Sequence, residues 1–157
     1  MSQWLADLDP GSNQSHEKAQ AALRQIGTNS FPVLLKMLRA EDSAWKTGLM
    51  NFENRHPRVR FHVAPASAVR QRAVQGYLAL GSEARSTVPV LIEILKTEPS
   101  PQVRSAVAGA LGSIGPEARA AIPELVKAAH DKNSELQQSA MVALSNIRAF
   151  DSPNTRF

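Results

Sequence analysis

The sequence predicts an all-α protein, a right-handed α-solenoid of about four similar units with an irregular insert after the first. Two observations predict this fold class. A similar stretch of residues recurs at intervals of 34 and then 33 positions, ending at Leu80, Ile114 and Ile147, and its apolar residues have helical spacing. A fourth copy ends at Ile26, so about 20 extra residues separate the first unit from the second. Such arrays bury the apolar side of each unit against its neighbours.

The first helix of each unit is predicted from columns that lie 3, 4, 7 and 11 positions before its last aliphatic residue. These offsets place one face of an α-helix in the core. Two of the columns hold small side chains, which lets neighbouring helices approach closely. The columns are Leu23, Tyr77, Leu111 and Leu144; Ala22, Gly76, Ala110 and Ala143; Ala19, Ala73, Val107 and Ala140; and Ser15, Val69, Val103 and Leu136.

A second helix is predicted in three of the four units, beginning near Ser30, Thr87 and Ala121. A proline stands two residues after each of these positions, which suits the first turn of a helix and no later one. A glycine ends the preceding helix in each unit by supplying a left-handed stop. The predicted buried stripes are Phe31, Leu34, Leu35 and Leu38; Val88, Leu91, Ile92 and Leu95; and Ile122, Leu125, Val126 and Ala129.

The chain is long enough for one domain with a continuous core, and we expect a single domain over residues 1–157. The last unit has no second helix, so part of its apolar face is predicted to lie open. The expected parts are a cap helix at 2–9, a first unit at 15–40, an insert at 41–68, a second unit at 69–97, a third at 101–131, a partial fourth at 134–150 and a tail at 151–157.

The segments Val103–Pro116 and Ala121–Val126 resemble HEAT repeats of the short bacterial, phycobilisome-lyase-like form. The resemblance covers roughly 15–40 and 69–150, and it implies an α-α superhelix. Relatives of this type include scaffolds, adaptors, lyase subunits and a few DNA-repair enzymes. A lyase or hydrolase role for this chain therefore rests on the analogy alone.

The net charge of +4 comes from one stretch of the insert and the start of the second unit. Residues 55–72 contain Arg55, Arg58, Arg60, Arg70 and Arg72 and no acidic residue, whereas the rest of the chain has 13 basic and 14 acidic side chains. We call these five arginines the basic patch. One interpretation is a sequence-independent site for the nucleic-acid backbone or for an acidic protein.

The insert itself allows other interpretations. Residues 43–54 suit an extra helix, and residues 57–63 alternate with the period of a β-strand, with apolar side chains on one side and basic ones on the other. This extended segment is either a strap lying across the array with solvated arginines, or the anion-binding strip above. A third alternative is an exposed strand edge that pairs with a partner or with its own copy.

No constellation of residues indicates catalysis, a cofactor or a metal site, and we expect none of them. The chain has no cysteine, and its carboxylates are scattered. His56 and His62 are about 20 Å apart if their segment is extended, and neither His16 nor His130 has a second ligand at metal-binding spacing. No stretch is apolar enough to span a membrane. The compartment is not specified by the sequence, and we take the cytoplasm as the default.

The second helices are predicted to line the concave face of the array. Residues off their buried stripes form an apolar seam, Val33, Met37, Val90 and Ile94, edged by cations such as Lys36 and Lys127. If exposed, this seam has the form of a peptide or helix-binding groove; the alternative is that these residues pack on the neighbouring helix. The predicted function is a non-catalytic scaffold for an unknown protein partner, through this face or the insert. Nucleic-acid binding and self-association, through the open last unit or the insert, are the alternatives.

Overall fold

The computed structural model describes residues 21, 24–43 and 64–149, and in these residues it contains helices and no β-strand. Three longer helices, α4 (Ala66–Leu80), α6 (Pro101–Ile114) and α8 (Ser134–Arg148), are the first helices of units two to four. Three shorter ones, α2 (Phe31–Leu38), α5 (Val88–Thr97) and α7 (Ile122–Ala128), are the second helices of units one to three. The predicted all-α solenoid is confirmed.

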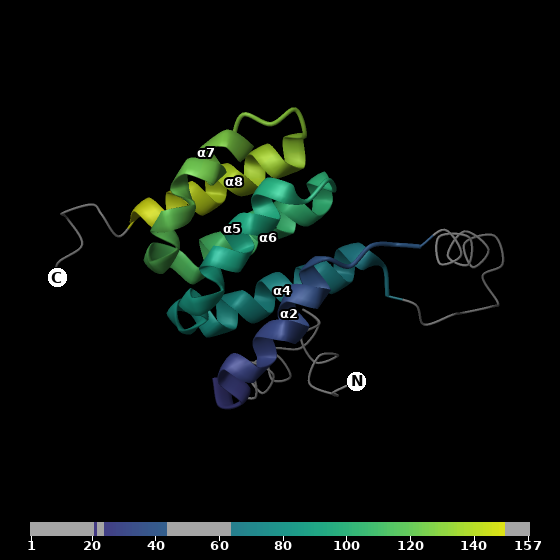
Figure 1. The fold of residues 1–157 in the computed structure, drawn as a ribbon, viewed down its shortest axis with the longest axis vertical. Helices are drawn as coiled ribbons and strands as arrows, with labels where there is room; N and C mark the ends of the chain where they lie inside the picture. Colours follow the sequence, from purple (N-terminus) through teal and green to yellow (C-terminus); the bar gives the residue numbers. More distant parts are fainter. Residues whose placement is uncertain (1–20, 22–23, 44–63, 150–157) are drawn as a thin grey trace.

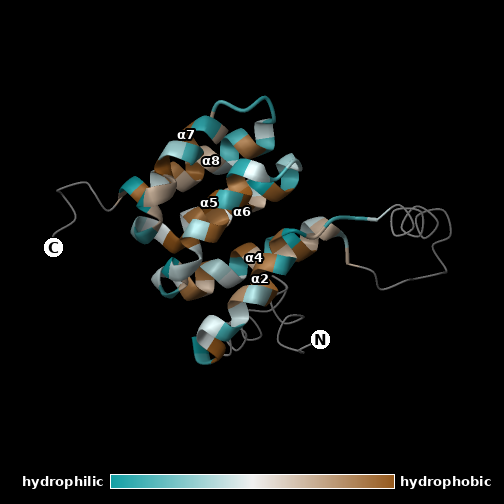
Figure 2. Ribbon diagram, viewed as in Figure 1, coloured by the Kyte–Doolittle hydropathy of each residue, from teal (hydrophilic) through white to brown (hydrophobic). Residues whose placement is uncertain are grey.

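The units are stacked along the long axis of the molecule, so that the chain passes from the first to the last without crossing back (Figure 1). α6 packs between α4 and α8, which makes the first helices one layer, and α5 contacts both α6 and α7. Hydrophobic residues gather where the helices face one another, whereas the loop between α7 and α8 is hydrophilic (Figure 2).

The predicted columns of the first helices form the core of this stack. In α6 the residues at these positions are almost fully buried, as are most of the matching sets in α4 and α8, where Val69 and Leu144 are half-buried. The first-unit members Ser15, Ala19, Ala22 and Leu23 lie outside the described residues. The buried members are Ala73, Tyr77 and Leu80; Val103, Val107, Ala110, Leu111 and Ile114; and Leu136, Ala140, Ala143 and Ile147. Burial of aliphatic side chains is the main stabilising contribution in such an array.

The turns between first and second helices follow the predicted chemistry closely. Gly27, Gly81 and Gly115 have φ of 57°, 51° and 81°, a region that favours glycine. Short 3₁₀ helices, η2 (Gly27–Ser30), η3 (Gly81–Thr87) and η4 (Gly115–Ala121), follow these glycines and lead into α2, α5 and α7. The predicted starts of the second helices are therefore confirmed, with proline in the first turn of each.

One glycine inside a helix is required for close packing. A Cβ atom added to Gly112 of α6 would lie 2.8 Å from the Cα atom of Ala143 in α8, closer than real side chains approach a backbone. α6 accordingly packs more extensively against α8 than against α4. The residue that corresponds to Gly112 in α4 is Leu78, and its side chain is 55 % exposed.

The two ends of the insert are held together. Both carboxylate oxygens of Asp42 accept from the backbone N–H of Ala66, at 2.9 and 3.1 Å, and so cap the start of α4. The Arg70 guanidinium donates to the carbonyl oxygen of Ala40 at 2.6 Å. α4 begins at Ala66, earlier than the predicted 69, because the apolar column begins at Val69 whereas Pro65 and the Asp42 cap start the helix one turn before it.

The extra helix at 43–54, the strand at 57–63, the cap helix at 2–9 and the tail at 151–157 lie outside the described residues, apart from the first residue of that extra helix, Ser43. α8 begins at Ser134 as predicted, and the preceding residue caps it: the Asn133 side chain accepts from the N–H of Leu136 at 3.0 Å. Asp131 accepts from the N–H of Asn133 and pairs with Arg104 at 3.2 Å, and these contacts, the first above all, lower its pKa.

Candidate functional site

Two of the second helices carry exposed apolar side chains at equivalent positions. Val33 of α2 and Val90 of α5 each follow the proline of the first turn, and they are 39 % and 46 % exposed. We call these two residues the valine row. The equivalent position of α7 is Glu124, and Val126, which is 37 % exposed, lies two residues further along on a different side of that helix. Single exposed valines are ordinary, but their recurrence at one position of consecutive second helices places apolar surface along one face of α2 and α5.

The predicted seam is only partly at this surface. Ile94 is 1 % exposed and belongs to the core, so the expectation that it lines a groove is wrong. Met37, in the equivalent position of α2, is half-buried against the same core, and Ala128 in α7 is buried. Conversely, Val126 was assigned to the buried stripe and is exposed.

Predicted and observed burial differ because each second helix contacts more than one neighbouring element. α5 contacts its own first-helix turn η3 and also α6, η4 and α7 of the next unit. A residue such as Ile94, just outside the stripe that faces one neighbour, is then buried by the other. Helical periodicity alone describes one buried face and cannot show which flank the second neighbour covers.

Charged side chains flank the valine row, and most of the cations on it are paired. Lys96 lies 3.8 Å from Glu93, Lys127 lies 2.9 Å from Glu124, and Arg39 at the end of α2 lies 3.8 Å from Glu98 at the end of α5. Such exposed pairs contribute little to stability, about 0–1 kcal/mol each. Lys36 of α2 is exposed and has no ion-pair partner in the part of the chain that the structure describes.

The structure gives one described member of the basic patch, Arg70, a structural role. Arg70 is half-buried, with its guanidinium on the carbonyl oxygen of Ala40, and Arg72 is half-buried as well. Arg55, Arg58 and Arg60 lie outside the described residues. The binding of phosphates by this patch stays a prediction, and Arg70 is already engaged within the fold.

Two hollows open on other parts of the surface. The larger, of about 560 Å³, lies between the end of α6, η4 and the end of α8, and its polar walls include Ser82, Glu117 and Asn146. The smaller, of about 220 Å³, lies in the valley across α4, α6 and α8. Neither is lined by the second helices. Within the described ranges, no group of three or more histidine, cysteine or acidic residues is placed to hold a metal ion.

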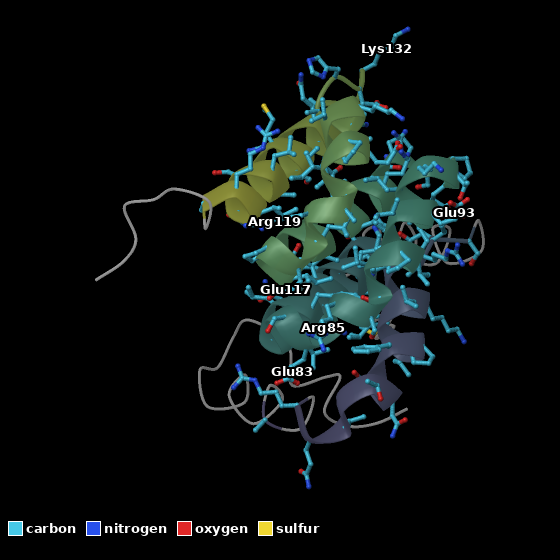
Figure 3. The ribbon with its side chains drawn as sticks, turned by 60° about the vertical axis from the view of Figure 1, so that its left-hand side comes forward. Glu83, Arg85, Glu93, Glu117, Arg119 and Lys132 are labelled. Atoms are coloured by element: carbon cyan, nitrogen blue, oxygen red, sulfur yellow. The ribbon has the colours of Figure 1, made fainter. Side chains whose placement is uncertain are left out.

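A second charged feature runs along one edge of the array. Glu83 and Arg85 on η3 recur as Glu117 and Arg119 on η4, so that acidic and basic side chains follow one another from unit to unit (Figure 3). The repeat length accounts for this order because each pair is 34 residues from the next. All four side chains are exposed.

Two features of the structure were not anticipated from the sequence. The hydroxyl of Tyr77 is buried and makes no hydrogen bond of good geometry among the described residues. Burial raises the pKa of Tyr77 to about 12, and the polar side chain of Thr87 partly opposes this rise. On α8, Met141 and Val142 are 52 % and 54 % exposed. The prediction of an open apolar face on the last unit was the signal for the second feature, but it named no residues.

Comparison with known proteins identifies the repeat. A family model described as HEAT repeats matches residues 61–145, more than half of the chain. This chain belongs to the HEAT-repeat family. No curated protein and no solved structure shows a significant match to it. HEAT repeats commonly mediate protein–protein interactions, and the fold is typically non-catalytic. No helix in the described part of this HEAT-repeat chain is long and apolar enough to cross a membrane.

Proposed function

We propose that this HEAT-repeat chain is a non-catalytic scaffold that binds a protein partner through the valine row on its second helices. The observation that carries the proposal is the recurrence of an exposed valine at the same position of α2 and α5, Val33 and Val90. A soluble surface has no need of aligned apolar residues, whereas a protein interface is built around them.

The charges of this face describe the partner. Lys96 and Lys127 already have carboxylate partners, so the charge near the valine row is largely balanced and should not attract a polyanion strongly. Lys36 adds one cation at its first-unit end. The face therefore suits an amphipathic helix or extended segment whose apolar side lies on the valines, with an acidic residue near Lys36.

The test compares captured proteins between native chain and surface variants. Val33→Glu/Val90→Glu should remove the bound partner from a pull-down in the source organism, because two carboxylates would be desolvated against its apolar side. The matched control is Leu78→Glu, which places a carboxylate on the exposed flank of α4. Thermal unfolding should confirm that all three proteins fold. An identical set of captured proteins from native chain and double variant would contradict the proposal.

A further inference from the structure

The outer face of α8 is bare in the structure. Gln138, Met141, Val142 and Ser145 lie on the side of the helix opposite its buried residues, at spacings that share one face, and all four are exposed. α8 contacts α6, α7 and η4 through its other side. No element of the described residues covers these four side chains, which we call the α8 face.

The composition of the α8 face is that of an interface. Residues 136–147 contain no charged side chain, so for more than three turns an exposed helix surface carries only neutral groups. The exposed surfaces of α2, α5 and α7, by contrast, each contain a lysine. Depletion of charge together with an exposed methionine is typical of the centre of a protein–protein interface.

The preceding repeat shows what a face in this position holds. Ser105, Ala108 and Gly112 of α6 stand 33 residues before Gln138, Met141 and Ser145, and they are buried. Gly109, the counterpart of Val142, is half-buried and lies toward Val74 of α4. α8 contacts both ends of this strip: the hydroxyl oxygens of Ser105 and Ser139 are 2.9 Å apart, and Gly112 meets Ala143. In this array, the same strip of a first helix is therefore a surface on which another helix packs.

The α8 face is also complementary to itself. Gln138 and Ser145 lie at equal distances on either side of the midpoint between Met141 and Val142, and near the same line along the helix. If two such helices lie antiparallel about that midpoint, the long amide of Gln138 comes opposite the small hydroxyl of Ser145 in the other copy, twice. Met141 then lies against its own counterpart at the centre.

The ends of the helix favour the same arrangement. Glu135 is in the first turn of α8, where its carboxylate also accepts from the Ser105 hydroxyl at 3.4 Å, and Arg148 is in the last turn. Antiparallel pairing brings the acidic end of one helix near the basic end of the other, and it opposes the two helix dipoles. Parallel pairing would place like charges together.

We propose that the α8 face binds a second copy of this chain, forming a twofold-symmetric dimer through antiparallel α8 helices. A closed twofold contact uses the same patch on both protomers, which agrees with the self-complementary order of the four residues. A contact through one helix face is small beside the roughly 800 Å² per partner of standard stable complexes, so we expect a weak dimer that forms at about micromolar to millimolar concentration. The proposal uses a different surface from the valine row and does not depend on it.

The first test is the mass of the full chain as its concentration rises. Sedimentation velocity from about 10 µM to about 1 mM should show the mass moving from 17.0 kDa toward twice that value. Met141→Asp should keep the protein monomeric throughout, because a carboxylate at the centre would face its copy. Leu78→Asp, a change at a leucine of α4 with similar exposure, should dimerise like the native chain.

The second test uses the absence of cysteine in the chain. In Met141→Cys the new thiol is unique, and a short bis-maleimide should join two protomers through it. Leu78→Cys should give little cross-linked dimer. A native chain that stays monomeric at the highest concentration, or dimers that persist in Met141→Asp, would overturn the proposal. Dimers that appear only after residues 151–157 are deleted would overturn it too, since the end of the chain would then be the occupant.

Discussion

The second and third units of the array use the same positions in different ways. Leu111 of α6 and Tyr77 of α4 are both fully buried, 34 residues apart, but the tyrosine places a hydroxyl in the core without a partner among the described residues. Gly112 makes a close contact with α8, whereas Leu78, its counterpart, is exposed. The column pattern thus specifies which positions face inward, and the identity of each residue decides how tightly the neighbouring unit packs there.

The arginines near the start of α4 and α6, by contrast, make similar contacts in the two units. Arg104 donates to the carbonyl oxygen of Leu95 at 3.2 Å, and Arg70, one repeat earlier, donates to that of Ala40. One junction is a three-residue link, Glu98–Ser100, and the other contains the long insert. At both junctions, therefore, an arginine of the first helix donates to a carbonyl oxygen at the end of the preceding second helix, and α2 packs on α4 despite the insert between them.

The largest effect is expected for the core of the third unit. Leu111→Ala should lower the free energy of unfolding by about 2–5 kcal/mol, because it removes a buried aliphatic group and leaves a cavity. Urea unfolding followed by circular dichroism measures this change. Lys127→Ala, a change at an exposed residue, should stay within about 0.5 kcal/mol. Equal effects of the two changes would contradict the assignment of the core.

Tyr77, the counterpart of Leu111 in the second unit, predicts that the stability of the fold depends on pH. Tyr77 is neutral in the folded protein and its pKa is raised to about 12, above the ordinary value near 10. The free energy of unfolding is therefore unaffected by this group below pH 10. It falls as the pH rises from 10 through 12, by about 2–3 kcal/mol in all, because the unfolded chain loses the Tyr77 proton more readily than the folded protein. Since Tyr77 is the single tyrosine of the chain, absorbance at 295 nm follows its titration alone.

The matched variant for this prediction is Tyr77→Phe. Below pH 9 it should be as stable as the native chain or more so, because a buried hydroxyl without a partner costs free energy. Between pH 10 and 12 it should lose less stability than the native chain. A tyrosine that titrates near pH 10 while the protein remains folded would show that the side chain is solvated.

The close contact between α6 and α8 predicts an unusual pair of effects. Gly112→Ala should destabilise the protein by about 1–3 kcal/mol although alanine favours helices, since its Cβ would meet the backbone of Ala143. Leu78→Ala at the equivalent site of α4 removes a larger group and should cost less than about 0.5 kcal/mol. Chemical unfolding of the two variants side by side checks the difference, and the reverse order would rule out the close approach.

The smallest effect concerns the junction with the insert. Asp42→Ala should cost about 1 kcal/mol, the usual contribution of a helix cap, because the N–H of Ala66 loses both of its carboxylate acceptors. Asp42→Asn keeps an acceptor and should recover part of this loss. Thermal melting of the three proteins measures the series, and an unchanged melting temperature in Asp42→Ala would show that the cap is not used in solution.

Much of this architecture was predictable because helical arrays repeat their chemistry. Most of the buried column positions of α4, α6 and α8 follow from apolar spacing, and the starts of the second helices near Ser30, Thr87 and Ala121 follow from proline position; the structure confirms both. Which residues of the second helices are exposed was harder to predict. Ile94 is buried because a second neighbour covers its flank of α5, a contact that periodicity within one helix does not encode.

The cap of α4 illustrates a further limit. Asp42 and Ala66 are 24 residues apart, and no local pattern joins a carboxylate to a helix start over that distance. For the last unit the sequence predicted an open apolar face but not which residues form it. The exposure of Met141 depends on which side of α8 packs on α6, and local periodicity does not encode that side. Local rules predict what each repeat does within itself, whereas contacts between distant segments need the assembled structure.

The closure of the insert by Asp42 and Ala66 also has a use in protein engineering. The chain leaves the array just after Asp42 and returns at Ala66 with the two residues in hydrogen-bonding contact. A reporter domain whose own ends lie close together can therefore be inserted between these anchors without separating α2 from α4. Such a fusion would report on the array from a fixed point of attachment while both the valine row and the α8 face stay unmodified.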